Sequence, residues 1–349
     1  MDRIKSILRV LATVILAIIG IFLFSFAKNY RRALNAPAHL APQFILLSFD
    51  GGKSIDVWED TLNFSKKLNS EGKPVHFTYF INAAYFLAPE NAKSYAPPLK
   101  PRGTSIINFS EDASHIDTRV KEVNRAILEG HEIASHLVGH FSGKSWNKNN
   151  WEQEFDSFDD IMSNIESKNP GLHLGQPSLL EQNPIRGFRA PYLHTNTHMY
   201  EVLHERKFAY DASEVSKGHE WPTIDTEGLW HIPYSTVEIG DSRTPVTAMD
   251  ALMYDLHDHE GKGNLKRGTA EWNAKKEEVL KSYRDYFKKS YGGNRAPISI
   301  GYHFWIHNDG LYWEALKEFA SEACGKPDVR CTTFSEFVTY LNSQPDLRN

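Results

Sequence analysis

Short apolar runs alternate with amphipathic helical patterns along most of the chain, and this alternation limits the fold more than any other feature. The apolar runs predict strands at residues 44–49, 77–81, 132–135, 185–188, 208–210, 229–232 and 298–302. Helical periodicity predicts helices at residues 56–68, 116–128, 151–167, 199–206, 271–291 and 311–323. Strands that alternate with helices build a parallel sheet. About seven such strands favour an α/β fold whose sheet closes into a barrel over an open doubly wound sheet.

The first 27 residues predict a membrane segment. Residues 10–27 contain no charged side chain, and a helix of this length spans about 27 Å, close to a hydrocarbon core of about 30 Å. We expect an anchor at 1–27, a linker at 28–42 and one globular domain at 43–349. The small residues Ser25 and Ala27 leave signal cleavage open. Either alternative puts the globular domain outside the cytoplasm, anchored in the periplasm or at the cell surface, or secreted.

The two cysteines bear on the compartment of the protein, and the overall charge bears on its partners. Cys324 and Cys331 can pair in an oxidising compartment, and two reduced thiols are the alternative. The net charge is −5 and no basic stripe is present, which argues against nucleic acid as a partner. Aromatic residues make up 12% of the chain, which fits either a large core or a sugar-binding groove.

Polar residues follow several predicted strands. Asp50 ends the first strand before two glycines, the sequence Arg-Ala-Pro-Tyr follows the fourth at 189–192, and His303 follows the last. In β/α barrels the active site gathers at the carboxyl ends of strands. Taken singly, each of these residues is equally typical of a turn or of a buried structural side chain.

The histidines at 136 and 140 predict a metal site. A spacing of four residues can direct both imidazoles at one ion if the segment turns helical there, although the chain has 16 histidines and the spacing alone is weak evidence. The residues between the pair include no glutamate, which excludes an H-E-x-x-H protease. The sequence also lacks a G-x-S-x-G elbow and a G-x-G-x-x-G fingerprint.

Together, four segments resemble the polysaccharide deacetylase family, also known as the NodB-homology or carbohydrate esterase 4 family. Residues 48–52 (Ser-Phe-Asp-Gly-Gly) resemble its Thr-Phe-Asp-Asp-Gly motif, and 136–140 resemble its His-Ser/Thr-x-x-His motif. Residues 189–192 match its Arg-x-Pro-Tyr motif, and 300–303 resemble its strand-ending Leu-x-His motif. Residues 210–213 are similar to a weaker fifth motif. The order and the rough spacing of the motifs agree across residues 44–340.

The resemblance implies a distorted (β/α)7 barrel that hydrolyses N-acetyl groups on amino sugars. It implies that Asp50 is the general base, that His303 is the general acid, and that Arg189 keeps Asp50 ionised. It further implies that His136 and His140 hold a divalent metal, for which we expect Zn²⁺ with Co²⁺ as the alternative.

The resemblance also implies substrate contacts. The Tyr192 backbone N–H is expected to stabilise the oxyanion, and Pro191, Tyr192 and Asp211 are expected to bind substrate. The expected partner is a polysaccharide that contains N-acetylglucosamine. Peptidoglycan fits the predicted location best, while chitin-like chains and exopolysaccharides remain open.

This sequence departs from the family pattern at three positions. The second aspartate of the family, normally a metal ligand, is Gly51 here. Leu137 replaces a hydroxyl residue, and the spacing before His303 is altered. Another residue or water can complete the metal site. The alternative is a catalytically inactive glycan-binding module on the same fold.

Overall fold

The computed structural model describes residues 41–344. The predicted anchor at 1–27 and nearly all of the linker lie outside this range, so the prediction of an anchor stays a prediction. Within residues 41–344, no helix combines the length and the apolar character that a bilayer crossing requires.

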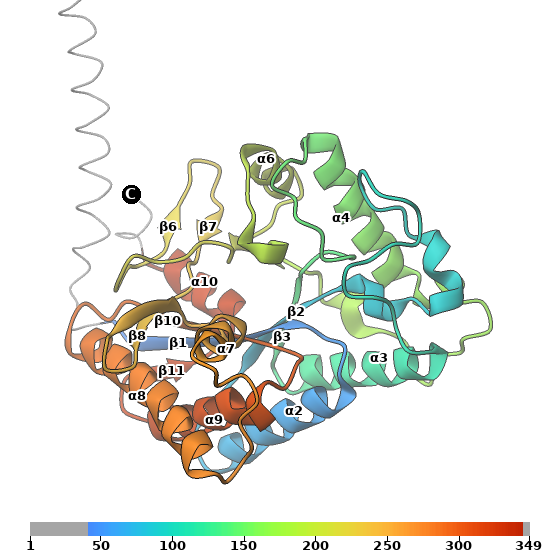
Figure 1. Ribbon diagram of the computed structural model, residues 1–349. Coiled ribbons are helices and arrows are strands. Elements are labelled where there is room, and N and C mark those ends of the chain that lie inside the picture. The colour runs from blue at the N-terminus through green and yellow to red at the C-terminus, as the bar shows by residue number, and fades with distance from the viewer. Residues whose placement is uncertain (1–40, 345–349) are drawn as a thin grey trace, which may run out of the picture.

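A curled sheet of mostly parallel strands forms the centre of the molecule (Figure 1). Its hydrogen-bonded order is β10-β1-β2-β3-β4-β5-β7-β6, and β11 pairs with the beginning of β1. The strands are β1 (Gln43–Gly51), β2 (Phe77–Ile81), β3 (Glu132–Ser135), β4 (Gly187–Phe188), β5 (Tyr210–Asp211), β6 (Thr223–Ile224), β7 (Trp230–His231), β10 (Ile298–His303) and β11 (Val329–Cys331). All seven predicted strands are present, and all are parallel to their predicted neighbours.

The sheet is a curled half-barrel, and the closed barrel expected from the sequence is only partly realised. In the described part of the chain, no ladder joins β7 to β10, and β6 pairs with β7 in the antiparallel sense. The segment after β7 bridges the gap, because the Ser235 N–H donates to the Ser299 carbonyl at 3.0 Å.

Helices cover the convex side of the sheet (Figure 1). The predicted helices appear as α2 (Ile55–Ser70), α3 (Ala113–Leu128), α4 (Lys148–Ser163), α6 (Thr197–Glu205), α8 (Ala270–Gly292) and α9 (Leu311–Ala323). The predicted helix at 151–167 is interrupted at Asn164, and its end forms the short α5 (Ile165–Lys168). The sequence did not predict α7 (Asp250–His259), α10 (Phe334–Asn342) or the hairpin of β8 (Thr236–Ile239) and β9 (Thr244–Thr247).

Alternation along β1 separates two hydrophobic cores. Ile45, Leu47 and Phe49 belong to the core between the sheet and its helices. Phe44 and Leu46 belong to a smaller core on the concave face, to which α10 contributes Phe337. Because successive side chains of a strand point to opposite faces, Ser48 and Asp50 continue the concave face beyond this core. Helix α10 thus fills the amino-terminal end of the concave face and leaves the carboxyl ends of the strands for polar groups.

The long segment from 213 to 296 is mostly packing, which was one of the two expectations for it. Trp221, Trp230 and Trp272 are buried and do not line a groove. The cysteine pair forms a disulfide between the end of α9 and β11, as expected for an oxidising compartment.

Candidate active site

Four of the predicted catalytic and metal-binding residues meet at the carboxyl ends of the parallel strands. Asp50 and His303 are register partners on the neighbouring strands β1 and β10. His136 follows β3, and Arg189 follows β4. The strand alternation places all four on the concave face. The structure therefore brings together residues that lie more than 250 positions apart in the sequence.

Asp50 and Arg189 form a fully buried ion pair. Arg189 Nη1 donates to Asp50 Oδ1 at 2.6 Å and to Ser48 Oγ at 3.0 Å. The guanidinium lies between the rings of Phe80 and Tyr234, 3.9 and 4.2 Å from their centres. Burial by itself raises the pKa of the Asp50 carboxyl, but the charge of Arg189, followed by that of His303, brings the pKa below its ordinary value. Asp50 is therefore a carboxylate at neutral pH.

His303 is held by Asp250, a residue that the sequence analysis missed. His303 Nδ1 lies 2.6 Å from Asp250 Oδ1, and the His303 backbone N–H donates to Asp250 Oδ2 at 3.1 Å. Burial lowers the pKa of His303, but the charge of Asp250 and its hydrogen bond outweigh burial and raise the pKa to about 9. His303 is therefore an imidazolium at neutral pH, with its second nitrogen available to donate a proton.

His136 and His140 present two neutral imidazoles to the same region. Their ring centres are 5.0 Å apart. His136 Nδ1 lies 2.8 Å from the Arg189 carbonyl oxygen, so Nε2 is the ring nitrogen that is left to bind a metal. Burial lowers the pKa of both rings, that of His140 to about 3. His140 Nδ1 is buried, and within the described residues it has no hydrogen-bond partner. These features fit two nitrogen ligands of a divalent metal.

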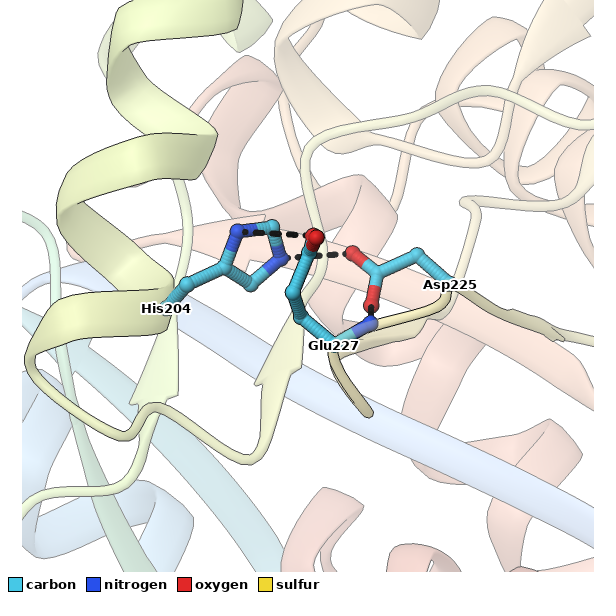
Figure 2. Close-up of side chains that lie close together, drawn as sticks. All are labelled: His204, Asp225 and Glu227. Atoms are coloured by element: carbon cyan, nitrogen blue, oxygen red, sulfur yellow. Dashed lines mark hydrogen bonds and ion pairs between the residues drawn. The ribbon is translucent and has the colours of Figure 1, made fainter.

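Within residues 41–344, no third ligand-type side chain lies at metal-binding distance from both histidines. Among residues 41–344, the one group of three ligand-type side chains at metal-binding distance is His204, Asp225 and Glu227, which lies outside the candidate site (Figure 2). His204 Nε2 lies 2.7 Å from Asp225 Oδ2, and His204 Nδ1 lies 3.3 Å from Glu227 Oε2. Both ring nitrogens of His204 thus lie close to carboxylate oxygens, and these contacts connect α6 to the turn between β6 and β7.

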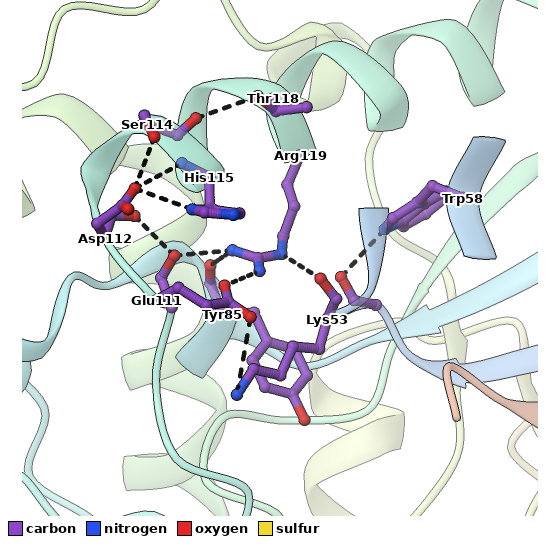
Figure 3. Close-up of polar contacts among 11 residues, drawn as sticks. Lys53, Trp58, Tyr85, Glu111, Asp112, Ser114, His115, Thr118 and Arg119 are labelled. Atoms are coloured by element: carbon purple, nitrogen blue, oxygen red, sulfur yellow. Dashed lines mark hydrogen bonds and ion pairs between the residues drawn. The ribbon is translucent and has the colours of Figure 1, made fainter. Parts of the chain in front are cut away.

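Position 51, where the family has a metal-binding aspartate, lacks a side chain here and also has a backbone conformation that favours glycine. Gly51 has φ 114° and Gly52 has φ 100°, values that residues with a Cβ rarely adopt. Arg119 Nε donates to the Lys53 carbonyl at 2.8 Å, and Trp58 Nε1 donates to the Gly52 carbonyl at 3.0 Å (Figure 3). This polar network fixes the loop after β1 in a conformation that suits glycine.

Glu154, on α4, holds the loop between the two histidines. Its buried carboxyl group accepts from the backbone N–H groups of Val138 and Gly139 at 3.2 and 3.3 Å, and the Tyr95 hydroxyl lies 2.8 Å from both of its oxygens. The loop needs this support, because Leu137 and His140 both have positive φ, 61° and 56°. Glu154 therefore stabilises the loop at a place where the family pattern has a hydroxyl and this chain has leucine.

The predicted substrate-binding residues have different surroundings. Tyr192 is 49% exposed, has φ 59°, and its ring packs against His140 with 4.7 Å between ring centres. Pro191 is buried behind it. Asp211 is completely buried, and its carboxyl group is bonded by Ser213 and Tyr200. Direct contact with a glycan is thus not supported for Asp211, because it has no exposed surface.

The sequence contained little to indicate Asp250 or Glu154. Asp250 begins a helix in a segment without a recognised motif, and its partner His303 is 53 residues away. Glu154 lies in an amphipathic helix with many other acidic residues. A buried position on the apolar stripe of that helix was the one available signal.

We predict that replacing Glu154 with glutamine removes a loss of folding stability that the wild-type protein suffers as the pH rises. Burial raises the pKa of Glu154 to about 7, above its ordinary value. The folded protein therefore binds this proton more tightly than the unfolded chain, so wild-type stability falls as the pH rises from about 4.5 to 7, by up to about 3 kcal/mol. The free energy of unfolding of Glu154→Gln relative to wild type should be higher at pH 8 than at pH 5. Equal differences at both pH values in denaturant titrations would contradict this prediction.

No protein-family model matches the chain. No curated protein matches it at a significant level.

Solved structures do match. A protein from Mycobacterium smegmatis, whose name assigns it to the polysaccharide deacetylases, has 14% sequence identity and a TM-score of 0.53, over 87% of this chain and 92% of that chain. Peptidoglycan deacetylase PdaC from Bacillus subtilis has 12% identity and a TM-score of 0.43, over 86% and 94%. A carbohydrate esterase 4 family pseudoenzyme from Bacillus anthracis has 9% identity and a TM-score of 0.42, over 85% and 66%. At these identities the likeness concerns the fold, and the first of these structures carries it: the chain has the fold of the polysaccharide deacetylases.

Proposed function

We propose that this protein is a hydrolase that removes acetyl groups from N-acetylhexosamine units of a polysaccharide. One observation carries the proposal: an ionised carboxylate, Asp50, and a protonated imidazole, His303, lie side by side on paired strands. Amide hydrolysis needs a base for the attacking water and an acid for the leaving nitrogen. The two buried imidazoles and the fold support the same reaction.

Asp50 acts as the general base and His303 as the general acid in this reaction. Asp50 removes a proton from water, whose oxygen adds to the acetyl carbonyl carbon. His303 gives its proton to the amide nitrogen as the carbon–nitrogen bond breaks, so that acetate leaves and a free amine stays on the sugar. Arg189 keeps Asp50 ionised between substrate turnovers, and Asp250 keeps His303 protonated.

Two further groups act on the carbonyl. The Tyr192 backbone N–H, at the turn after β4, is positioned by Pro191 to donate to the developing oxyanion. His136 and His140 would hold a divalent metal, Zn²⁺ or Co²⁺, which would supply Lewis-acid polarisation of the acetyl carbonyl.

The location proposed for this activity follows from the N-terminal segment. An anchored or secreted enzyme with an oxidised cysteine pair would meet envelope glycans, and we propose peptidoglycan as the substrate. This part of the proposal depends on residues 1–27, which lie outside the described range.

A glycan-binding module without activity is the second candidate, and Gly51 favours it. An enzyme with two protein ligands has a weaker hold on its metal than one with three. Activity assays decide between the two candidates.

We predict that Asp250→Asn lowers the pKa of His303 from about 9 toward its ordinary value near 6.5. Because the folded pKa is raised, the Asp250–His303 pair contributes stability below about pH 6.5, and this contribution disappears as the pH rises through 9. The stability lost in Asp250→Asn should therefore be up to about 3 kcal/mol at pH 6 and much smaller at pH 10. NMR titration of His303 and denaturant unfolding at both pH values measure the two effects. An unchanged His303 pKa would contradict the assignment.

We predict that Gly51→Ala destabilises the metal-free protein by about 1–3 kcal/mol and that Gly51→Asp costs at least as much, because it adds a second carboxylate next to Asp50. A Cβ at this position has room, with Phe304 Cβ at 3.8 Å and Tyr85 at 4.0 Å, so the cost of the alanine comes from the backbone. Added Zn²⁺ should raise the melting temperature of the aspartate variant more than that of the alanine variant. The same zinc response in both variants would show that position 51 does not face the metal.

We predict that Asp50→Asn reduces acetate release from N-acetylglucosamine oligomers by about 10²–10⁴-fold, because the variant lacks the general base. The assay uses the purified protein with added Zn²⁺ or Co²⁺. Asp241→Asn, an exposed carboxylate outside the candidate site, is the matched control and should release acetate at the wild-type rate.

The variant also leaves the Arg189 charge without its partner, which costs about 3–5 kcal/mol. Circular dichroism must therefore show that Asp50→Asn is folded at the assay temperature. If wild type releases no acetate with either metal, the protein is a binding module.

A further inference from the structure

An exposed tryptophan follows the proposed general acid by two positions. Trp305 is 70% exposed and Ile306 is 60% exposed. The preceding residue, Phe304, is buried, and its ring centre lies 4.8 Å from that of Trp58. The Phe304 N–H donates to the Asp50 carbonyl at 3.2 Å. The chain is therefore fixed immediately before Trp305, beside the base of the proposed reaction.

The indole ring is supported from the other side by a column of rings. The ring centres of Trp305 and His307 are 4.5 Å apart, and those of His307 and Tyr254 are 4.3 Å apart with nearly parallel planes. Burial lowers the pKa of His307, so this ring is neutral at neutral pH. An indole supported in this way keeps its orientation without a bound partner, which reduces the entropy lost on binding.

The surroundings connect Trp305 to the proposed chemistry. Trp305, Ile306 and His307 line one pocket together with Asp250 and His303. Within residues 41–344, Tyr192 and Trp305 are the two aromatic residues among the large hydrophobic side chains with high exposure, and both flank the candidate site. Tyr192 follows β4 and Trp305 follows β10, on opposite sides of β1 in the sheet order. The other seven tryptophans are buried or half-buried.

An exposed aromatic ring next to the candidate site is suited to binding a neighbouring sugar of a polysaccharide. In the proposed reaction the new amine stays on its sugar, so the neighbouring sugars of the chain extend away from the reaction site, and Trp305 lines the pocket on the His303 side of that site. Pyranose rings carry an apolar face of C–H groups, and aromatic rings bind such faces without requiring charge.

We propose that Trp305 is a sugar-stacking platform that binds the glycan unit next to the one being deacetylated. This inference rests on the proposed function and adds to it a subsite on the His303 side. The platform sets a preference for chains over single sugars, because a single N-acetylhexosamine fills the reaction site and leaves Trp305 exposed.

Acrylamide quenching of tryptophan fluorescence tests the platform directly, since Trp305 is the most exposed of the eight tryptophans. N-acetylglucosamine oligomers of one to five units are titrated into the wild-type protein and read within minutes of mixing. We expect longer oligomers to protect the fluorescence from acrylamide and the monomer to give no protection. Trp305→Ala should raise the Kd for the pentamer about 5–10-fold, measured by calorimetry, and Trp305→Phe should restore most of the affinity.

The matched control is Leu128→Ala at the end of α3, a residue that is 77% exposed at the opposite end of the strands. It should bind the pentamer as wild type does. The steady-state counterpart is a higher KM of Trp305→Ala for the pentamer at an unchanged kcat, with no change in KM for short substrates.

Two results would overturn the platform. Equal pentamer affinity for wild type and Trp305→Ala would show that Trp305 does not bind the chain. If the wild-type protein still releases acetate in that case, the proposed function survives. Protection of Trp305 by phosphatidylcholine–phosphatidylglycerol vesicles but not by oligomers would assign the exposed residues to a membrane contact instead. A protein that binds the pentamer through Trp305 yet releases no acetate would keep the platform and exclude the catalytic activity.

Discussion

Arg189 and Asp50 form an ion pair that is removed from water, and the geometry of the site depends on it. A buried arginine and a buried aspartate are each expensive alone, and losing one partner costs about 3–5 kcal/mol. Here the guanidinium also lies between two aromatic rings and bonds to Ser48 and the Ala212 carbonyl. These contacts connect β1, β4 and the segment after β5. The same arginine offers its carbonyl to His136, so one residue fixes both the base and a metal-binding imidazole.

The two faces of the sheet explain why this pair lies at one end of the strands. Helices bury the convex face, while α10 fills the amino-terminal part of the concave face with Phe334, Phe337 and Leu341. Polar side chains on the concave face are left at the carboxyl ends. There they are close enough to shift one another's pKa values in opposite directions, that of Asp50 downward and that of His303 upward. A base that stays ionised and an acid that stays protonated at the same pH follow from this arrangement.

The departures from the family pattern have local structural counterparts. At Gly51 the loop has a backbone conformation that Arg119 and Trp58 hold in place. This conformation favours glycine, so it disfavours the aspartate that the family has at this position. At Leu137 the absent hydroxyl coincides with a buried carboxyl group, Glu154, that bonds the next two backbone N–H groups. The histidine loop thus keeps its shape by a different interaction, whereas within the described residues no carboxylate at ligand distance replaces the one missing at position 51.

The sequence by itself indicated seven parallel strands, six of the helices, the resemblance to the family's fold, and the strand ends at which Asp50, His136, Arg189 and His303 lie. It could do so because strand periodicity is local and because the motifs keep their order along the chain. Only the tertiary structure decided that the sheet stays open between β7 and β10, that Asp250 holds His303, and that Glu154 supports the histidine loop. It also showed that Asp211 is buried while Trp305 is exposed. Each of these depends on contacts between segments far apart in the chain, and no local pattern of residue types specifies which distant groups will meet.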